Sequence, residues 1–285
     1  MVSKVSIVTG ANKGIGLAVC RGLRKQVGGT IILTARNEQR GLAAVDQLNA
    51  EGCNTVFEQL DIADPISINR FKDRVHNKYN GIDILCNNAG HKFPVHTTNS
   101  AFEKASVTMA TNLVGTRNVT NYLLPLMNQG GRICNVAALL GILNWCFPDQ
   151  HNPYRLQLLS DSLTEQQILE VMEDYVTAMK HEDFTYFKDS PYAAYLMSKV
   201  LLIALTRVQG VALMRDPRGI MINSCFPGFV NTDLSGNMGP LTPDKGAISP
   251  LMVCQLPDGA GNGRFFNRKK KVDWATFVTA PAPKL

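Results

Sequence analysis

The sequence Thr9-Gly10-Ala11-Asn12-Lys13-Gly14-Ile15-Gly16 is a glycine-rich turn that joins an apolar segment at residues 4–9 to a segment of helical period at 17–23. Glycines allow a sharp turn and a close approach of the backbone to a phosphate, and the start of a helix offers free N–H groups. The spacing G-x-x-x-G-x-G is less specific than G-x-G-x-x-G, so the motif alone is also compatible with a simple loop. Its place between a strand and a helix favours a dinucleotide site, with contacts expected from Gly10, Asn12, Lys13, Gly14, Ile15 and Gly16.

Short apolar runs rich in β-branched residues alternate with longer segments of helical period along the whole chain. This alternation is typical of βαβ units and predicts an α/β fold, a doubly wound Rossmann-type domain with a mainly parallel, seven-stranded sheet. We expect residues 1–285 to form this single domain, because such folds often exceed 200 residues. Ligands bind beyond the carboxyl ends of the strands. The expected strands lie near residues 4–9, 30–34, 54–60, 82–86, 131–137, 219–225 and 263–266.

Residues 144–191, between the fifth strand and the next strong helix, are far longer than an ordinary connection. Ser162-Leu163-Thr164-Glu165 resembles a helix start, and the apolar residues that follow recur at helical spacing. The segment is therefore predicted to be a helical insertion. A surface excursion and a helical flap beside the binding cleft are both compatible with this pattern.

The composition is that of a globular protein, with 45% hydrophobic and 18% charged residues. No secretion signal and no apolar run of about 20 residues is present, which favours a cytoplasmic protein that does not enter a membrane. Seven scattered cysteines without a C-x-x-C pair indicate reduced core thiols, and five histidines without ligand spacing predict no metal site. The basic run Arg268-Lys269-Lys270-Lys271 is interpreted as a solvated loop in preference to a nucleic-acid contact.

The end of the second strand indicates which dinucleotide is bound. Folds that bind NAD usually place an Asp or Glu there for the adenosine ribose, whereas an Arg accommodates a 2′-phosphate. This chain carries Leu33-Thr34-Ala35-Arg36-Asn37, without a carboxylate. Arg36 can pair with a phosphate through its planar guanidinium, and Lys13 adds a second positive charge. The sequence therefore favours NADP(H) over NAD(H), although each of these two residues taken singly also fits a purely solvated surface position.

Tyr195 and Lys199 form a Y-x-x-x-K pair in a segment of helical period at 193–213, so both side chains lie on one face. The pair alone is weak evidence, since this spacing arises easily by chance. Its chemistry is informative, because a phenol with a pKa of about 10 is a proton donor and a neighbouring ammonium lowers that pKa. Such a pair can give a proton to a carbonyl oxygen while hydride reaches the carbon.

Taken together, these motifs resemble the short-chain dehydrogenase/reductase family over nearly the whole chain. The turn at residues 9–16, Asn87-Asn88-Ala89-Gly90, Asn112, the Tyr195–Lys199 pair and Pro227-Gly228 occur in the family's order. Within the family the chain looks most like the monomeric NADPH carbonyl reductases. That narrower resemblance rests on Asn12 to Gly16, Thr34-Ala35-Arg36, Leu60-Asp61-Ile62, the long insertion and the ending Phe265 to Trp274.

The resemblance implies a role for each matching residue. Tyr195 would donate the proton, Lys199 would bind the nicotinamide ribose and lower the Tyr195 pKa, and Asn112 would anchor a proton-relay water. In the family's reductases the insertion obstructs the helix-to-helix oligomer contact, which implies a monomer. Further cofactor contacts are implied for Asp61, Ile62, Asn88, Ala89, Gly90, Pro227, Gly228, Val230 and Thr232.

One position departs from the family pattern. Ala138 occupies the place of the catalytic serine, and no Ser or Thr lies between residues 136 and 143. Asn144 or a group of the insertion is a candidate to compensate. The resemblance therefore implies an NADPH-dependent reductase of aldehydes, ketones or quinones, with a catalytically weak or inactive NADP(H)-binding sensor or interaction protein as the alternative. The apolar side chains of Phe229, Leu139, Leu140 and Trp145 suggest an apolar carbonyl substrate.

Overall fold

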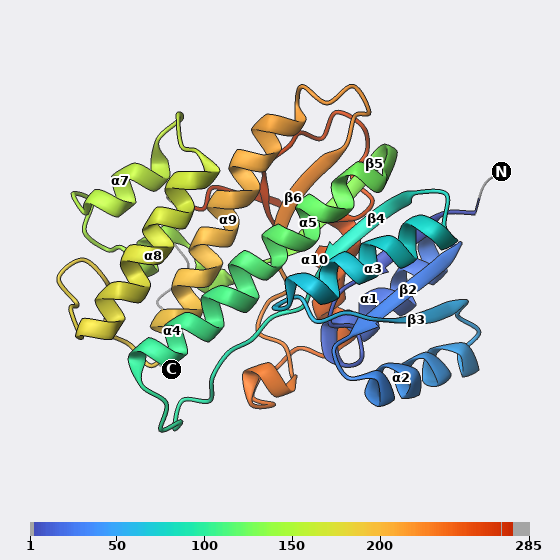
Figure 1. The fold of residues 1–285 in the computed structure, drawn as a ribbon, viewed down its shortest axis with the longest axis horizontal. Helices are drawn as coiled ribbons and strands as arrows, with labels where there is room; N and C mark the ends of the chain where they lie inside the picture. The colour runs from blue at the N-terminus through green and yellow to red at the C-terminus, as the bar shows by residue number, and fades with distance from the viewer. Residues whose placement is uncertain (1–2, 269, 276–285) are drawn as a thin grey trace.

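Eight strands form one sheet in the order β3-β2-β1-β4-β5-β6-β7-β8 in the computed structural model, which describes residues 3–268 and 270–275 (Figure 1). Each neighbouring pair is parallel except the last, in which β8 runs antiparallel to β7. The mainly parallel α/β sheet confirms the predicted fold class. The strands are β1 (Val5–Val8), β2 (Thr30–Ala35), β3 (Thr55–Gln59), β4 (Ile82–Asn87), β5 (Met127–Val136), β6 (Met221–Phe226), β7 (Phe265–Asn267) and β8 (Lys270–Val272).

The predicted number of seven strands is wrong, because β8 is an eighth. This strand has only three residues and begins with two lysines, so its composition matches a solvated loop better than a strand. Pairing with β7 supplies its backbone hydrogen bonds, and Val272 is buried. At the outer edge of the sheet the lysine side chains remain in water, which is how edge strands commonly carry charge.

Helices cover both faces of the sheet and bury it between two apolar layers. α1, α2 and α10 pack on one face, and α3, α4, α5 and α9 lie on the other. Alternate residues of one strand serve the two layers, as when Ile7 faces one and Val8 the other. The helices are α1 (Gly14–Gln26), α2 (Glu38–Ala50), α3 (Pro65–Lys78), α4 (Ala101–Met109), α5 (Thr116–Leu123), α6 (Leu143–Cys146), α7 (Pro153–Leu159), α8 (Glu165–His181), α9 (Ala193–Leu213) and α10 (Pro243–Val253).

Between residues 144 and 191 the chain forms most of α6, then α7 and α8, which lie at one end of the molecule (Figure 1). α8 begins where the sequence pattern places a helix start: the Thr164 hydroxyl accepts a hydrogen bond from the Gln167 N–H, and the Gln167 side-chain oxygen accepts one from the Thr164 N–H. Ile168, Val171 and Tyr175 of α8 are fully buried. Each such apolar side chain contributes about 1.5–3 kcal/mol of stability.

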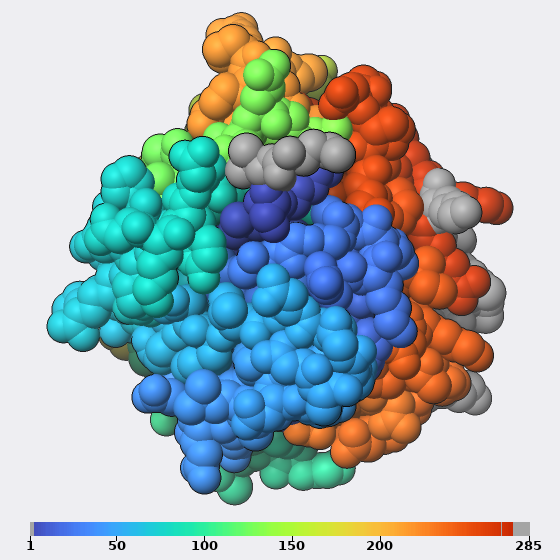
Figure 2. All heavy atoms as spheres, turned by 90° about the vertical axis from the view of Figure 1, so that its right-hand side faces the viewer, coloured from blue at the N-terminus to red at the C-terminus, as the bar shows by residue number. Residues whose placement is uncertain are grey.

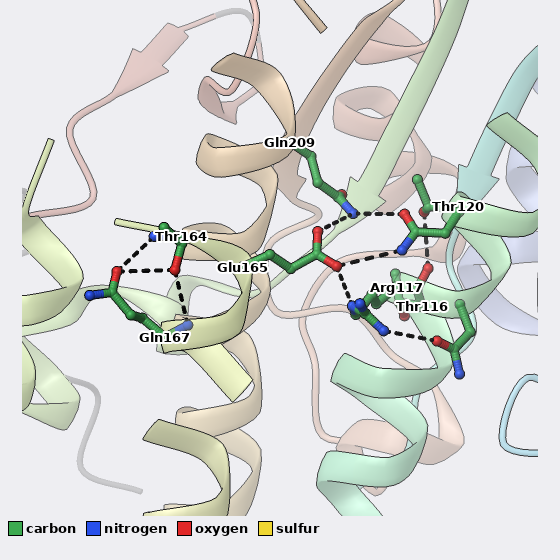
Figure 3. A network of polar contacts seen from close by, with 9 residues as sticks. Thr116, Arg117, Thr120, Thr164, Glu165, Gln167 and Gln209 are labelled. Atoms are coloured by element: carbon green, nitrogen blue, oxygen red, sulfur yellow. Dashed lines mark hydrogen bonds and ion pairs between the residues drawn. The ribbon is translucent and has the colours of Figure 1, made fainter. Parts of the chain in front are cut away.

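A polar network fixes the start of α8 to the neighbouring helices (Figure 3). The Glu165 carboxylate forms an ion pair with Arg117 of α5 and accepts hydrogen bonds from Asn121 and Gln209 at 3.5 Å each. Gln209 belongs to α9, and its amide also reaches Asn121 at 3.4 Å. Three helices from separate parts of the chain are therefore joined through one partly buried carboxylate.

Segments that are far apart in the sequence meet at the opposite end of the molecule. Figure 2 shows the start of the chain (blue) beside segments from its last third (orange and red). Arg21 of α1 there contacts Asp244 of α10 at 3.1 Å. By length and composition, α9 is the one helix among the described residues that could span a membrane, but most of it is buried inside the protein.

All seven cysteines are free and buried, as expected of core thiols. The sulfur atoms of Cys86, Cys134 and Cys254 lie within 4.8 Å of one another, a set that could hold a soft metal ion. These thiols lie in an apolar layer of the core. Free buried cysteine commonly acts as a small apolar residue, so we interpret the three as packing residues.

Candidate active site

The glycine-rich turn is held in a shape that only glycine permits. Gly10 has a φ of +61°, and a Cβ atom added there would lie 2.8 Å from the Ala89 Cα. A Cβ at Gly16 would lie 2.5 Å from the Asn88 amide nitrogen. No side chain caps the start of α1 at Gly14. The turn therefore presents uncapped N–H groups at a helix N-terminus, where an anion is favoured.

The Asn88 side chain holds this turn against the end of β4. Its amide donates to the carbonyl oxygens of Thr9 at 3.0 Å and Gly10 at 3.2 Å. In return, the Thr9 hydroxyl accepts from the N–H groups of Asn88 and Ala89, at 3.0 Å each. The predicted residues Asn88, Ala89 and Gly10 are therefore brought together, and the amide of Asn88 serves the shape of the turn.

The two predicted cationic residues have different surroundings. Arg36 follows β2 directly, is exposed, and forms no ion pair with another described residue. The Lys13 ammonium instead pairs with Asp233, in the loop that follows β6. Both partners of that pair are more than half exposed, so the pair adds little stability. Arg36 is consequently the cation with its guanidinium available for a phosphate.

Asp61 and Ile62 follow β3 and lie in a tight turn before α3. One carboxylate oxygen of Asp61 accepts from the Ala63 N–H at 3.0 Å, and the Asp61 N–H donates to the Ser67 hydroxyl at 2.9 Å. Ile62 is buried. The loops after β2 and β3 thus begin at the same side of the sheet, at the carboxyl ends of two parallel strands.

Tyr195 and Lys199 lie one turn apart near the start of α9. The Lys199 ammonium is buried, donates to the Val136 carbonyl oxygen at 3.0 Å, and lies 5.5 Å from the centre of the Tyr195 ring. Burial lowers the pKa of Lys199 to about 8. Burial raises the pKa of Tyr195 above its ordinary value, whereas a neighbouring ammonium is expected to lower it. The Tyr195 phenol is therefore protonated at neutral pH.

Asn112 reaches Tyr195 through a serine that the sequence analysis missed. Asn112 is fully buried in a π-helical turn between α4 and α5, and such turns are frequent at functional sites. Its side-chain amide donates to the Ser198 hydroxyl at 3.0 Å and to the His91 carbonyl at 2.8 Å, while its oxygen accepts from the His91 N–H at 2.7 Å. The Ser198 hydroxyl donates to the Tyr195 carbonyl at 2.8 Å. A polar residue on a buried helix face, next to Lys199, was the signal available.

The segment after β5 has an alanine, Ala138, at the place where the resemblance implies a serine hydroxyl. Ala138 is extended and precedes a short 3-10 turn at Leu139–Gly141, which packs closely against α9. A Cβ added at Gly141 would lie 2.9 Å from the Lys199 carbonyl oxygen. Asn144 follows this turn, and its amide oxygen is buried without a hydrogen-bond partner among the described residues. The unpaired atom is an acceptor, so a hydrogen bond from Asn144 to a substrate carbonyl would have to come from the NH2 group of the same side chain.

The loop after β6 returns to the glycine-rich turn. Gly228 has a φ of +88°, and Val230 is buried and bridges to Leu241. Thr232 approaches Gly14, since a Cβ added to that glycine would lie 3.1 Å from the Thr232 methyl carbon. Thr232, the last of the predicted residues in this loop, therefore lies beside the first turn of α1.

The three side chains predicted to contact substrate are not equally placed. Leu139 and Trp145 are half-buried and pack against the core around α9. Phe229 lies on the loop after β6 and is 43% exposed. An exposed aromatic ring of this size on a loop is available for contact with an apolar molecule.

Comparisons with known proteins agree with this arrangement. Residues 4–147 match the short chain dehydrogenase family. The chain is 38% identical to carbonyl reductase [NADPH] 1 of Bos taurus over 277 residues, 95% of this chain and 98% of the relative. It is 40% identical to carbonyl reductase [NADPH] 3 of Mus musculus over 263 residues, 90% and 93% of the two chains. The structure of salutaridine reductase from Papaver somniferum is similar with a TM-score of 0.82, at 28% identity, covering 93% of this chain and 99% of that one.

Proposed function

This chain belongs to the short-chain dehydrogenase family, and from that membership we propose that it is an NADPH-dependent reductase of aldehydes, ketones or quinones. The observation that carries the proposal is the arrangement of the partly exposed Tyr195 beside the buried Lys199 and Asn112, with Ser198 linking Asn112 to the Tyr195 backbone. A nucleotide-binding protein without chemistry needs no proton donor at this place. The chain's relatives include proteins named carbonyl reductase [NADPH].

The residues around the glycine-rich turn fit a phosphorylated dinucleotide. Gly10 and Gly16 let the turn pack closely against Ala89 and Asn88, and the uncapped start of α1 favours a pyrophosphate. Arg36 would hold the 2′-phosphate, with Lys13 as a second cation. NADPH supplies a hydride when bound. The remaining contacts are proposed for Asn12, Gly14, Ile15, Asp61, Ile62, Asn88, Ala89, Gly90, Pro227, Gly228, Val230 and Thr232, together with Tyr195 and Lys199.

Proton donation falls to the Tyr195 phenol. Because its pKa is raised by burial, the hydroxyl carries its proton at neutral pH and can give it to a carbonyl oxygen that gains negative charge. The Lys199 ammonium, fixed to the Val136 carbonyl, stabilises the phenolate that remains. Asn112 holds the loop at His91 and the helix at Ser198 in one position.

The absence of a hydroxyl group at Ala138 is expected to lower the rate of turnover. A hydroxyl at this place would hold and polarise the substrate carbonyl, and loss of one such donor costs about 100- to 1000-fold in turnover in other enzymes. We propose that the NH2 group of the Asn144 side chain partly replaces this donor. The alternative, a sensor that binds NADP(H) without useful turnover, is motivated by the same alanine. Leu139, Trp145 and Phe229 would contact an apolar substrate.

We also propose that residues 1–285 form one monomeric, cytoplasmic domain in which 144–191 is a helical insertion. α8 packs on α4 and α9 and is joined to α5 through Glu165. The insertion thus covers surfaces of these helices that would otherwise be open to a second copy of the chain. The seven free cysteines fit a reducing compartment. The proposal includes no nucleic-acid partner, no membrane partner and no metal.

The test is NADPH oxidation with a panel of quinones, aromatic aldehydes and diketones, together with a binding titration of NADPH. The proteins compared are the unmodified chain, Tyr195→Phe and Ala138→Ser. Turnover by the unmodified chain that Tyr195→Phe abolishes supports the reductase, and we expect Ala138→Ser to be faster. Tight NADPH binding with turnover only in Ala138→Ser would favour the sensor instead.

A further inference from the structure

A pocket is formed by residues between the start of α7 and residue 187, and the proposed reaction does not use it. Its volume is about 250 Å³, and it is formed by α7, the last turns of α8 and the loop that follows α8. This is enough space for the head group of a small ligand. The side chains that matter here are Tyr154, Asp174, His181, Asp183, Tyr186 and Phe187.

One wall of the pocket is aromatic. The rings of Tyr154 and Phe187 stack with centroids 4.7 Å apart, and the Tyr186 ring meets Tyr154 edge-on at 6.0 Å. Phe187 is buried and contacts Tyr175 of α8 at 5.2 Å, which anchors the group in the core. Tyr186 is 50% exposed. The wall is therefore rigid at its base, and it presents ring surface to water at its rim.

The other wall is negatively charged. Asp174 accepts a hydrogen bond from the Tyr154 hydroxyl at 3.1 Å, and Asp183 lies in the turn directly after α8. The last turn of α8 also lines the pocket, and a helix C-terminus carries partial negative charge on its free carbonyl groups. His181 lines the same wall.

The surrounding segment reinforces this charge. Residues 161–189 contain eight Asp and Glu but only two Lys, although the whole chain has a formal net charge of +6. The acidic character of the pocket is thus a local feature, opposite in sign to the protein as a whole. A ligand with positive charge is attracted to such a region, and an anion is repelled.

We propose that this pocket binds a small organic cation, in particular a quaternary or methylated ammonium group. Aromatic ring faces attract a diffuse positive charge and also shield its methyl groups from water. The two carboxylates and the α8 terminus supply the compensating charge. An apolar neutral ligand would gain from the rings alone, and an inorganic cation would gain from the carboxylates alone, so only an organic cation uses both walls. The site does not depend on the proposed reductase activity.

Choline is the probe, and 3,3-dimethylbutanol is its neutral control of the same shape. Binding to the full chain is followed by ligand-observed NMR and by mapping the shifted backbone amides. We expect choline to bind and the neutral alcohol to bind at least about 3-fold more weakly, as cation–π contributions at exposed sites imply. The shifted amides should lie in α7, the end of α8 and residues 182–187. Equal binding of the two probes, or shifts confined to other parts of the chain, would overturn the proposal.

Variants separate the two walls from general damage to the fold. Tyr186→Leu removes an exposed ring, and Asp174→Asn removes one charge while keeping the acceptor for Tyr154. Each is expected to weaken choline binding about 3- to 10-fold. Glu173→Gln removes an exposed charge next to Asp174 on a residue that does not line the pocket, and it should leave binding within a factor of two, on the order of normal scatter. If Glu173→Gln weakens binding as much as Asp174→Asn, the pocket is not the site.

Discussion

At the scale of single residues, a protonated phenol lies near a position that lacks a hydroxyl group. In the proposed reaction Tyr195 gives up its proton, but it does not by itself hold the substrate carbonyl in line. A serine hydroxyl would do this from position 138, where the chain offers only a methyl group. Asn144 is the polar residue after this turn: its oxygen, buried and unpaired among the described residues, is an acceptor, and the donor that it offers is its NH2 group. In the proposed site, the position of the substrate carbonyl therefore depends on the neighbours of Tyr195, since no serine hydroxyl is present at position 138.

Arg36 should determine the choice between NADPH and NADH. The substitution Arg36→Gln removes the exposed guanidinium, and charge-assisted hydrogen bonds to phosphate contribute about 1.5–3 kcal/mol. We expect NADPH to bind about 10- to 100-fold more weakly and NADH to bind unchanged, as measured by fluorescence titration. Arg215→Gln, an exposed position after the end of α9, is the matched control. An equal loss for both nucleotides in Arg36→Gln would contradict this role.

Ser198 should act as a positioning residue for Tyr195. Ser198→Ala removes the acceptor for Asn112 and the donor to the Tyr195 carbonyl, so the start of α9 loses its link to the π-helical turn. Small misplacements of reacting groups cost up to about 100-fold in rate. We expect kcat to fall about 10-fold with KM for NADPH unchanged. Ser198→Thr, which keeps the hydroxyl, should recover part of the rate, and a variant that loses only stability would argue against positioning.

At the scale of elements, α8 depends on one carboxylate at its start. The Glu165 carboxylate pairs with Arg117 and accepts hydrogen bonds from Asn121 and Gln209, which belong to α5 and α9 (Figure 3). The helix also has a capping box and a buried apolar face, so its position is fixed at its first turn and along one side. Loosening the first turn should therefore change the mobility of α8 more than the strength of the core.

Glu165→Gln tests this attachment. The variant keeps a side chain of the same length but loses the ion pair, and it leaves Arg117 without its partner. Hydrogen bonds to charged groups contribute about 1.5–3 kcal/mol when buried, and partial exposure reduces this, so we expect a loss of about 1 kcal/mol in the free energy of unfolding. Amide exchange in α8 should accelerate more than in β4. Glu170→Gln, exposed on the same helix, should change neither quantity.

At the scale of the whole molecule, the buried ammonium of Lys199 links stability to pH. Its pKa is lowered to about 8 in the folded chain, whereas an exposed lysine has a pKa of about 10.4. Between these values the unfolded chain binds more protons than the folded chain. The free energy of unfolding therefore rises with pH across this window, because protonation of the unfolded chain becomes less favourable.

We expect Lys199→Met to lack this rise. The contribution in the unmodified chain reaches up to about 3 kcal/mol between pH 8 and pH 10.4. Urea unfolding of both proteins at several pH values in this range measures it as the difference between the two curves. If the two stability curves run parallel across the range, the ammonium of Lys199 is not desolvated as the structure indicates.

The alternation of short apolar runs with helical segments was sufficient to predict the mainly parallel sheet. Spacing alone was enough to place Tyr195 and Lys199 on one helix face. These features are local, since periodicity and turn chemistry act over a few residues. The short strand β8 was missed because three residues rich in lysine have no local preference strong enough to mark them.

Contacts between distant residues could not be obtained in the same way. Ser198 meets Asn112 across 86 residues of sequence, and the pocket on α7 and α8 joins side chains from three segments. The raised pKa of Tyr195 is a consequence of burial, which no spacing encodes. Periodicity in the sequence thus determined most of the elements and the face that each one buries. Only the tertiary structure set which polar groups meet and how strongly water is excluded from them. The reason is that desolvation depends on neighbours that only the folded chain brings into contact.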